Sequence, residues 1–514
     1  MKKQPDFMKN MSAIHRRDLL KRLSLLAASP LIPRAFSLGL AGLLGDEAMA
    51  QASEPKFFLE VNFRDQWDMG CAFVPPSIAK NYNNLGKDGD EGIAFFNAPT
   101  QVGNHFLTRE GMALKDHVDT IAVTELGELV IGSIHGHEAG NGLRSPGRSY
   151  TAGAGRGDMS GADPRPNGNQ GGNEVLFSST PTPAVLYNHY TKSKDGDLKN
   201  GILLRSSIRA NSHTFYHYNA NLNNAQLDRF FDKKQLFNHF ATAGGKPQGD
   251  VLTTYRAELV DLVKKLDTSF LKEIQLTQSK ADGHLAALAL AAKKNEGRLT
   301  KETLQLTADE SKFWTSGIPG QFECAGDNAD QCTEREGTMN IGEMFAYIAK
   351  MFQSGSFRSA AVDFDFHDVH TARTEAVLTN QGKQFGLSLS RLIQTLKDAG
   401  IYDKTVIALY TLDGSRSPKR NSTGDGSKNA VVLVGGGIKG GYYGDVSFKG
   451  RDVYYHRPDD NGNAVADGAR DQNKRVPNAD VYRTVTRAIG IPDDVVNQFP
   501  DAKNGKVLKY MLKA

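Results

Sequence analysis

The sequence predicts an α/β fold, a three-layer sandwich in which helices cover both faces of a mostly parallel central sheet. Beyond residue 338, extended segments alternate with amphipathic segments of helical length, which is typical of parallel sheets. The extended segment 405–412 is apolar almost throughout, as expected for a strand that is buried on both faces. Residues 53–514 are numerous enough to bury a large core, either as one such domain or as two smaller ones.

The first half of the chain supplies the first strand and two long segments of unusual composition. Phe57–Phe63 is rich in aromatic and β-branched residues and is the first expected strand. Residues 120–123 and 128–134 suggest another extended region. Residues 139–173 are rich in Gly, Arg, Ser and Asn and predict a long loop, which is usually functional or disordered. Residues 250–312 alternate apolar and charged positions at helical spacing, so we expect a helical insertion that covers one face of the sheet.

The second half of the chain supplies the regular alternation. We expect helices at residues 341–352, 375–399 and 481–489, and strands at residues 359–366, 405–412 and 430–434. Gly400 is expected to end the long helix, and Asn478 or Asp480 to cap the last one.

The N-terminal segment predicts export. Residues 15–21, with the sequence His-Arg-Arg-Asp-Leu-Leu-Lys, follow the twin-arginine pattern closely. A weakly apolar run over residues 23–44 and a small-x-small cleavage site at residues 48–52 complete a signal peptide that covers residues 1–52. A retained membrane anchor is the alternative, but prolines, glycines and Arg34 interrupt the roughly 20 apolar residues that a span requires.

Export decides where the protein is expected to act. We expect a periplasmic, extracellular or cell-surface protein whose partner during export is the twin-arginine translocase. After cleavage, no later segment of residues 53–514 is long and apolar enough for a stable membrane span.

The distribution of charge excludes one class of partner. Residues 1–52 hold eight Lys or Arg and four Asp or Glu, and the whole chain holds 62 and 58. Residues 53–514 therefore hold 54 of each (62 minus 8, and 58 minus 4) and are neutral. Because the basic balance belongs to the export signal, we expect no nucleic-acid partner.

The three cysteines allow one disulfide. Cys324 and Cys332 flank a short polar loop and are expected to pair in an oxidising compartment, with two free thiols as the alternative. Cys71 lies beside an apolar stretch and is expected to be a small buried hydrophobe.

Carboxylates and histidines gather where the expected strands end. In sheets of this kind, ligands bind beyond the carboxyl ends of the strands. Carboxylate and imidazole groups are ligands of Zn²⁺, Mn²⁺ and related ions. Any one Asp could instead cap a helix or form a turn, but together these residues predict a metal or catalytic site. The candidate metal ligands are Asp68, His135, His137, Asp365, His367, Asp368, His370, Asp413 and Asp425.

The order of these motifs resembles a known family. An Asp after the first strand is followed by a histidine-bearing segment at 135–138, an Asp-x-His motif and the block Asp-Gly-Ser-Arg-Ser-Pro at 413–418. Val-Val-Leu-Val-Gly-Gly-Gly-Ile-Lys-Gly-Gly follows at 431–441. The order is similar to that of a widespread family of twin-arginine-exported bacterial proteins, largely of unknown function, which is related to the alkaline phosphatase/sulfatase superfamily. The resemblance covers most of residues 55–495 and is strongest over 359–445.

The resemblance implies an alkaline phosphatase-like fold and a metal-dependent hydrolase of small-molecule or polymeric phosphate or sulfate esters. It implies a divalent metal, Zn, Mn or Ca, with Asp68 as one ligand. It makes either Asp365 with His367, or Asp368 with His370, the Asp-x-His ligands, and it puts Asp413 where the family has an acidic residue, usually Glu.

The resemblance also implies catalytic residues. Arg416 matches its place in the motif. Ser133 is the hydroxyl residue nearest the place expected for the nucleophile, and Ser145 and Ser149 compete with it.

The chain departs from the family's pattern at one place. The family commonly has Gly-Arg-Asp-His before the Gly-Gly-Gly strand, whereas residues 424–428 are Gly-Asp-Gly-Ser-Lys. Lys428 could contact an anionic oxygen of a substrate but cannot bind a metal while protonated. His456 is a distant candidate for the missing ligand. An alternative function is therefore a non-catalytic exported surface or ligand-binding protein that has lost part of its metal site, and a third is isomerisation or transfer on the same fold.

Overall fold

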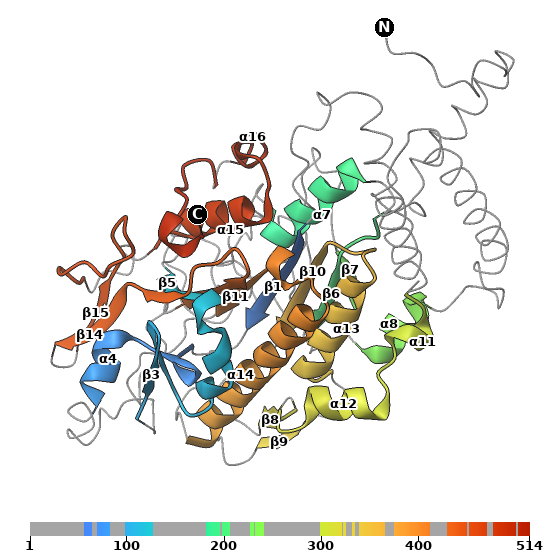
Figure 1. Ribbon diagram of the computed structural model, residues 1–514, viewed down its shortest axis with the longest axis horizontal. Coiled ribbons are helices and arrows are strands. Elements are labelled where there is room, and N and C mark those ends of the chain that lie inside the picture. Colours follow the sequence, from blue (N-terminus) through green and yellow to red (C-terminus); the bar gives the residue numbers. More distant parts are fainter. Residues whose placement is uncertain are drawn as a thin grey trace, which may run out of the picture. The chain divides into compact units, whose positions relative to one another are not determined.

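The computed structural model describes most of the core of the chain (Figure 1). By contacts the chain divides into two compact units, residues 1–53 with 237–304, and residues 54–236 with 305–514. The central sheet and the helices that cover it belong to the second unit. The described residues are 56–63, 69–82, 98–126, 181–195, 198–205, 227–230, 232–240, 299–320, 322–324, 332–334, 339–364, 375–411, 429–449, 452–469, 476–499 and 502–513.

The described strands of the second unit build an eight-stranded sheet in the order β13-β5-β12-β11-β1-β10-β6-β7. Every neighbouring pair is parallel except the two that involve β12, which runs antiparallel to β11 and to β5. The predicted mostly parallel sheet is confirmed. Its strands are β1 (Phe57–Phe63), β5 (Ile121–Leu126), β6 (Ile202–Arg205), β7 (Asp228–Phe230), β10 (Ser359–Phe364), β11 (Thr405–Thr411), β12 (Asn429–Gly435) and β13 (Gly441–Tyr443).

Two helical layers cover the sheet, one on each face (Figure 1). On one face lie α7 (Pro183–Lys194) and α15 (Asn478–Ile489), and on the other lie α13 (Ile341–Gln353) and α14 (Glu375–Asp398). The other described helices of the second unit are α4 (Pro76–Lys80), α12 (Ala308–Thr315), α16 (Asp493–Val496) and the 3₁₀ turns η2 (Met69–Cys71), η3 (Gly111–Thr120), η8 (Tyr402–Lys404) and η10 (Lys509–Met511). The helix α8 (Lys233–Phe240) begins in the second unit and ends in the first, and α11 (Lys301–Leu304) belongs to the first.

The central strand β1 is buried on both faces because its side chains alternate between the two helical layers. Phe58 packs in a core with residues of α7 and α15, and its ring lies 6.2 Å from that of Tyr187. Phe57 faces the opposite layer, where its ring lies 5.2 Å from that of Phe352 on α13. Burying each of these side chains contributes about 1.5–3 kcal/mol. The continuous apolar run of β1 is thus the middle of the core.

Local signals explain where the covering helices begin and end. Asn340 and Glu343 form a capping box at the start of α13. Gly400, with a φ of 67°, follows the end of α14 as expected. The predicted cap of α15 is wrong, because the helix begins at Asn478 after Pro477 without a side-chain cap. Asp480 lies inside the first turn instead, where its Oδ1 accepts a 2.8 Å hydrogen bond from the backbone N–H of Lys506.

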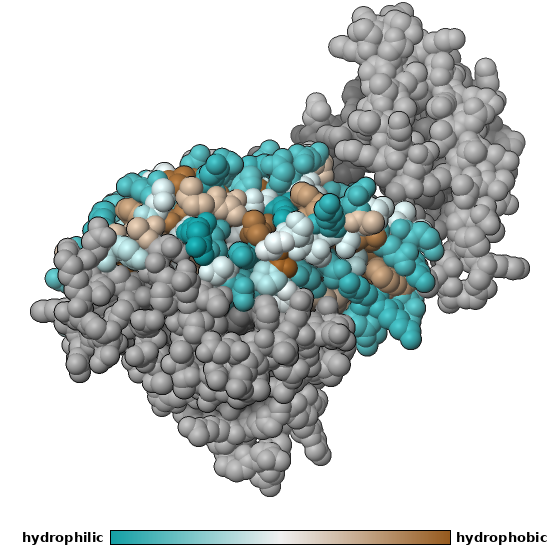
Figure 2. All heavy atoms as spheres, turned by 90° about the horizontal axis from the view of Figure 1, so that it is seen from below, coloured by the Kyte–Doolittle hydropathy of each residue, from teal (hydrophilic) through white to brown (hydrophobic). Residues whose placement is uncertain are grey.

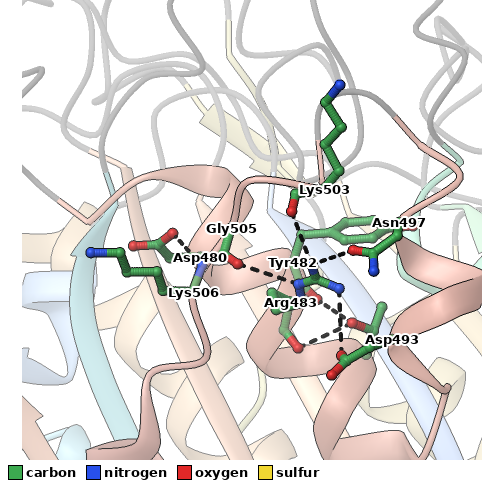
Figure 3. A network of polar contacts seen from close by, with 9 residues as sticks. Asp480, Tyr482, Arg483, Asp493, Asn497, Lys503, Gly505 and Lys506 are labelled. Atoms are coloured by element: carbon green, nitrogen blue, oxygen red, sulfur yellow. Dashed lines mark hydrogen bonds and ion pairs between the residues drawn. The ribbon is translucent and has the colours of Figure 1, made fainter.

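Arg483 joins α15 to the segments that follow it (Figure 3). Its side chain is only 10% exposed, and its Nη2 donates to Asn497 Oδ1 at 2.6 Å and to Lys503 O at 3.0 Å. Its Nε donates to Gly505 O at 3.3 Å, and Nη1 lies 3.4 Å from Asp493 Oδ1. This single guanidinium therefore fixes α16 and residues 502–506 on the outer side of α15.

Three small sheets complete the described strands. The first holds β2 (Phe73–Val74), β3 (Thr100–Val102) and β4 (His105–Leu107), the second β14 (Asp445–Lys449) and β15 (Asp452–His456), and the third β8 (Phe322–Cys324) and β9 (Cys332–Glu334). Cys324 and Cys332 are direct partners in the antiparallel β8–β9 ladder. Cys71 is a buried free cysteine, as predicted.

The described surface offers little apolar area. Seen from below the view of Figure 1, the coloured residues are mainly hydrophilic with scattered apolar ones (Figure 2). Phe313 on α12 is 48% exposed, and the guanidinium of Arg391 lies 5.6 Å from its ring centroid. Within the described parts of the chain, no helix has the length and apolar character to cross a membrane.

Several expected segments lie outside the described residues. These are the signal peptide at 1–52, the extended segment at 128–134, the Gly-rich loop at 139–173 and residues 250–298 of the helical insertion. Residues 299–312 of that insertion are described, and they include α11 and the first residues of α12.

Candidate functional site

Three parallel strands end together at the carboxyl edge of the sheet. In the ladder, Phe63 at the end of β1 is the partner of Phe364 at the end of β10 and of Thr411 at the end of β11. The chain therefore leaves all three strands at one level. Residues 64, 365 and 412 are the next along the chain, so the segments that carry Asp68, Asp365 and Asp413 all depart from this edge.

The reversed strand β12 brings one further segment, and the far end of the segment that carries Asp413, to the same edge. Because β12 is antiparallel to β11, it begins where β11 ends. Its first residue, Asn429, is the ladder partner of Leu126, the last residue of β5. Lys428 immediately precedes Asn429, and the segment that carries Ser133 and His135 follows Leu126. All four segments that carry candidate residues thus start or end at one edge of the sheet.

The candidate side chains themselves lie outside the described residues. This holds for the candidate metal ligands Asp68, His135, His137, Asp365, His367, Asp368, His370, Asp413 and Asp425, and for the candidate catalytic residues Ser133, Arg416 and Lys428. Among the residues that the structure does describe, no group of three or more His, Cys, Asp or Glu side chains could hold a metal ion.

His456 is not a substitute for the missing histidine. Its Nδ1 lies 2.9 Å from Val465 O and its Nε2 lies 2.6 Å from Ser447 Oγ. A carbonyl oxygen only accepts, so Nδ1–H donates to Val465 O, and Nε2 shares a hydrogen bond with the Ser447 hydroxyl. Gly468 lies against the ring, where an added Cβ would come within 2.5 Å of it. Both nitrogens are thus engaged locally, which argues against His456 as a metal ligand.

The helix α7, which the sequence-based prediction missed, also points toward this edge. Ala184 N donates to Oε2 of Glu60 in the middle of β1, and the Tyr187 hydroxyl donates to Lys56 O near the start of β1. The helix therefore runs antiparallel to β1, with its N-terminus toward the carboxyl ends of the strands. Thr182 as the N-cap and Pro183 as the first helical residue were the signals that could have located it.

Two buried polar residues, Asn62 and Tyr410, lie on the face of the sheet beneath α7 and α15, close to the carboxyl edge. Asn62 on β1 is the ladder partner of Tyr410 on β11 and of Asp363 on β10. Asn62 and Tyr410 are both 0% exposed. Within the described part of the chain, the two amide atoms of Asn62 and the hydroxyl of Tyr410 have no hydrogen-bond partner. Such orphaned buried groups are rare and call for a missing water, ion or functional contact.

Burial and neighbouring negative charge keep the Tyr410 hydroxyl protonated. Burial raises the pKa of Tyr410 well above its ordinary value, and the negative charge of Glu60 and the neighbouring Tyr482 raise it further. The phenol therefore keeps its proton at every physiological pH. The Tyr410 hydroxyl and the Asn62 amide are thus neutral groups that can donate hydrogen bonds without adding charge.

Comparison with known proteins gives structural likenesses only. No family model and no curated protein matches the chain. A protein of the alkaline phosphatase superfamily from Vibrio parahaemolyticus is similar, with 7% identity and a TM-score of 0.34 over 86% of this chain and 68% of that chain. The lipoteichoic acid synthase LtaP from Listeria monocytogenes gives 10% identity and a TM-score of 0.33 over 86% and 73%. The PsFucS1 sulfatase from Pseudoalteromonas sp. gives 12% identity and a TM-score of 0.33 over 94% and 76%. Because values of this size do not establish shared chemistry, the function proposed below rests on the sheet edge of this chain.

Proposed function

We propose that this chain is an exported hydrolase of phosphate or sulfate esters that works with a divalent metal ion at the carboxyl edge of its sheet. The observation that carries the proposal is the convergence of four segments that bear acidic, basic or histidine residues on one edge, at Phe63, Leu126, Phe364, Thr411 and Asn429. In parallel α/β sheets this edge is where ligands bind.

The residue types in these segments fit a metal site. The carboxylates at 68, 413 and 425 would hold the ion together with either Asp365 and His367 or Asp368 and His370, and the histidines at 135 and 137 would complete the set. A bound divalent ion would supply positive charge that favours an ionised nucleophile and the charged oxygens of the ester.

The other residues have separate roles in the proposed reaction. The hydroxyl of Ser133, or of Ser145 or Ser149, would give up its proton and form the new bond to phosphorus or sulfur. The bond to the leaving alcohol breaks, the alcohol oxygen takes a proton, and water then releases the inorganic anion. Arg416 and Lys428 would donate to the non-bridging oxygens and stabilise the developing charge.

The residues at 428 and 456 favour a second function. Lys428 occupies the place where the resembled family commonly has a histidine, and His456 is engaged with Val465 and Ser447. If the metal set is incomplete, the same edge would bind an anionic ligand without turning it over, as a surface or ligand-binding protein does.

Metal analysis together with an ester assay separates the two functions. We would measure bound metal in residues 53–514, and the hydrolysis of p-nitrophenyl phosphate and p-nitrophenyl sulfate with added Zn²⁺, Mn²⁺ or Ca²⁺. Asp365→Ala combined with Asp413→Ala is expected to abolish metal binding and turnover. The matched control is Asp398→Ala, which removes an exposed carboxylate at the end of α14. Absence of metal and of turnover in the unaltered protein would rule out the enzyme.

A further inference from the structure

Ser447 and His456 form a close pair on the small sheet of β14 and β15. Both lie on one face of that sheet, because His456 is the ladder partner of Asp445 and the side chains of a strand alternate between its faces. Ser447 Oγ lies 2.6 Å from His456 Nε2, within the reach at which a base takes the proton of a nucleophile. Both residues are partly exposed, so the pair is accessible from solvent.

The imidazole of His456 is held in one orientation. Its Nδ1–H donates to Val465 O at 2.9 Å, and Gly468 lies against the ring, where an added Cβ would come within 2.5 Å of Cε1. In the neutral ring Nδ1 carries the only proton, so the lone pair of Nε2 faces the Ser447 hydroxyl. A base that a third group orients is the arrangement that activates serine nucleophiles. Here the third group is a main-chain carbonyl.

Other serines of the described chain lack such a base. The Ser354 hydroxyl donates to Met351 O at 2.6 Å, and the Ser359 hydroxyl donates to Ala184 O at 2.8 Å. A carbonyl oxygen accepts a hydrogen bond but is too weak a base to take the proton. Ser447 therefore differs from these serines in its chemistry as well as in its place.

We propose that Ser447 and His456 form a second, metal-independent site that accepts acyl groups from carboxylic esters. The hydroxyl proton of Ser447 passes to His456 Nε2 as the Ser447 oxygen forms a bond to the carbonyl carbon. The bond from that carbon to the leaving alcohol then breaks, and the alcohol oxygen takes the proton from Nε2. Water hydrolyses the acyl-serine ester by the same route and releases the carboxylic acid.

The inference goes beyond the proposed function. Neither residue lies in the segments that carry the candidate metal ligands and catalytic residues. The substrate class follows from the chemistry of the pair, since serine with an oriented histidine attacks a carbonyl carbon on many unrelated folds without a metal ion.

A fluorophosphonate probe tests the site, because it bonds covalently to an activated serine hydroxyl and releases fluoride. The protein is treated with the probe in the presence and absence of EDTA, and the labelled peptide is identified by mass spectrometry. We expect the label on Ser447 under both conditions. With p-nitrophenyl acetate we expect a stoichiometric burst of p-nitrophenolate, the sign of an acyl-serine intermediate.

Three variants separate the roles of the two residues. Ser447→Ala is expected to abolish the label and the burst. His456→Gln keeps a polar side chain that cannot take the proton, so labelling of Ser447 is expected to slow by about 100-fold or more. Ser354→Ala is the matched control, because it removes a partly exposed hydroxyl that lacks a base, and both readouts should stay unchanged. Thermal unfolding followed by circular dichroism establishes that each variant is folded.

The unaltered protein alone can overturn the proposal. Absence of a label on Ser447, labelling of Ser354 at the same rate, or loss of the Ser447 label in EDTA would each contradict it. Undiminished labelling of folded His456→Gln would contradict the role of the base. Because none of these measurements uses a phosphate or sulfate ester, their outcome does not depend on the proposed function at the carboxyl edge.

Discussion

The backbone N–H of Ala184, at the start of α7, donates a 2.9 Å hydrogen bond to Oε2 of Glu60 on the central strand, and both residues are fully buried. A helix N-terminus carries partial positive charge, so it favours a carboxylate at this place. The contact fixes the height of α7 on the sheet. It also orients the helix with its N-terminus toward the edge at which the candidate site residues depart.

Loss of the Glu60 carboxylate should therefore loosen α7. Glu60→Ala leaves the Ala184 N–H buried without this acceptor and creates a cavity, so we expect about 3 kcal/mol of destabilisation in urea unfolding. Glu60→Gln keeps an acceptor and should cost less. The exposed Glu302 serves as the control, since Glu302→Gln should leave the midpoint unchanged. Equal midpoints for Glu60→Ala and the unaltered protein would show that the contact adds nothing to stability.

Arg483 should matter more to stability than its charged partner does. Arg483→Ala leaves the carbonyls of Lys503 and Gly505 without their donor, and we expect a loss of about 3 kcal/mol in the free energy of unfolding. The Asp493 side chain is 56% exposed, so Asp493→Asn should cost less than about 1 kcal/mol. The two variants are compared by thermal unfolding, and a larger loss for Asp493→Asn would contradict the assignment of the network to Arg483.

His105 should make the protein less stable in acid. It is buried on β4, its ring lies 5.3 Å from that of Phe73, and its Nε2 lies 2.8 Å from Ile121 O. Burial lowers its pKa from 6.5 to about 4, so the unfolded chain binds a proton in a range where the folded chain does not. The contribution of neutral His105 to the free energy of unfolding is present in full above pH 6.5 and is lost as the pH falls from 6.5 to about 4. The free energy of unfolding lost through this one group is about 3 kcal/mol.

The difference between two proteins isolates this titration. His105→Gln keeps an N–H donor near Ile121 O but cannot titrate. Its free energy of unfolding should fall less steeply between pH 6.5 and about 4 than that of the unaltered protein. Parallel curves over this range would show that another group is responsible.

The register of β8 and β9 supports the predicted disulfide. Cys324 and Cys332 lie directly opposite each other in the ladder, and opposed residues of antiparallel strands have a Cα separation that a disulfide can span. We expect the oxidised protein to show one bond between them by non-reducing mass spectrometry. Replacing both with Ser should cost about 2–3 kcal/mol, as closing a loop of this length predicts. Cys71→Ala should leave the bond intact, and alkylation of both thiols in oxidised protein would disprove it.

The twin-arginine signal can be tested in cells. Changing both Arg16 and Arg17 to lysine should leave the precursor in the cytoplasm, because the pathway depends on the arginine pair. Cell fractionation with an antibody against residues 53–514 measures the outcome. Changing Lys2 and Lys3 to arginine should leave export unchanged. Export of the precursor that lacks the arginine pair at the normal rate would point to another route.

The sequence was informative where local pattern and burial agree. Phe57–Phe63 was predicted to the residue, and the long helix ends at Asp398, one residue before the predicted end and just ahead of Gly400, because apolar runs and a C-terminal glycine are strong local signals. The strand order and the reversal of β12 depend on contacts between distant segments, which no local pattern contains. The cap of α15 was misjudged because Pro477 and Asn478 offer equally plausible starts.

The candidate site, too, could be predicted only where local sequence patterns indicate it. Its segments could be placed after strands from composition alone, and the ladder puts those strand ends on one edge. Asn62 was missed because a single amide within an apolar strand gives no signal until its burial and its lack of partners are known. The roles of the individual candidate ligands stay predictions.

The reversal of β12 has a consequence for how this protein could diversify. Because β11 ends and β12 begins at the same edge, residues 412–428 are an excursion that departs from and returns to one place on a rigid support. Residues 127–180 are bounded in a similar way by Leu126 and by α7. Each excursion could be exchanged as a cassette, in evolution or by grafting, without changing a strand of the sheet. Ligand preference and fold stability would then be inherited separately, from different stretches of the same gene.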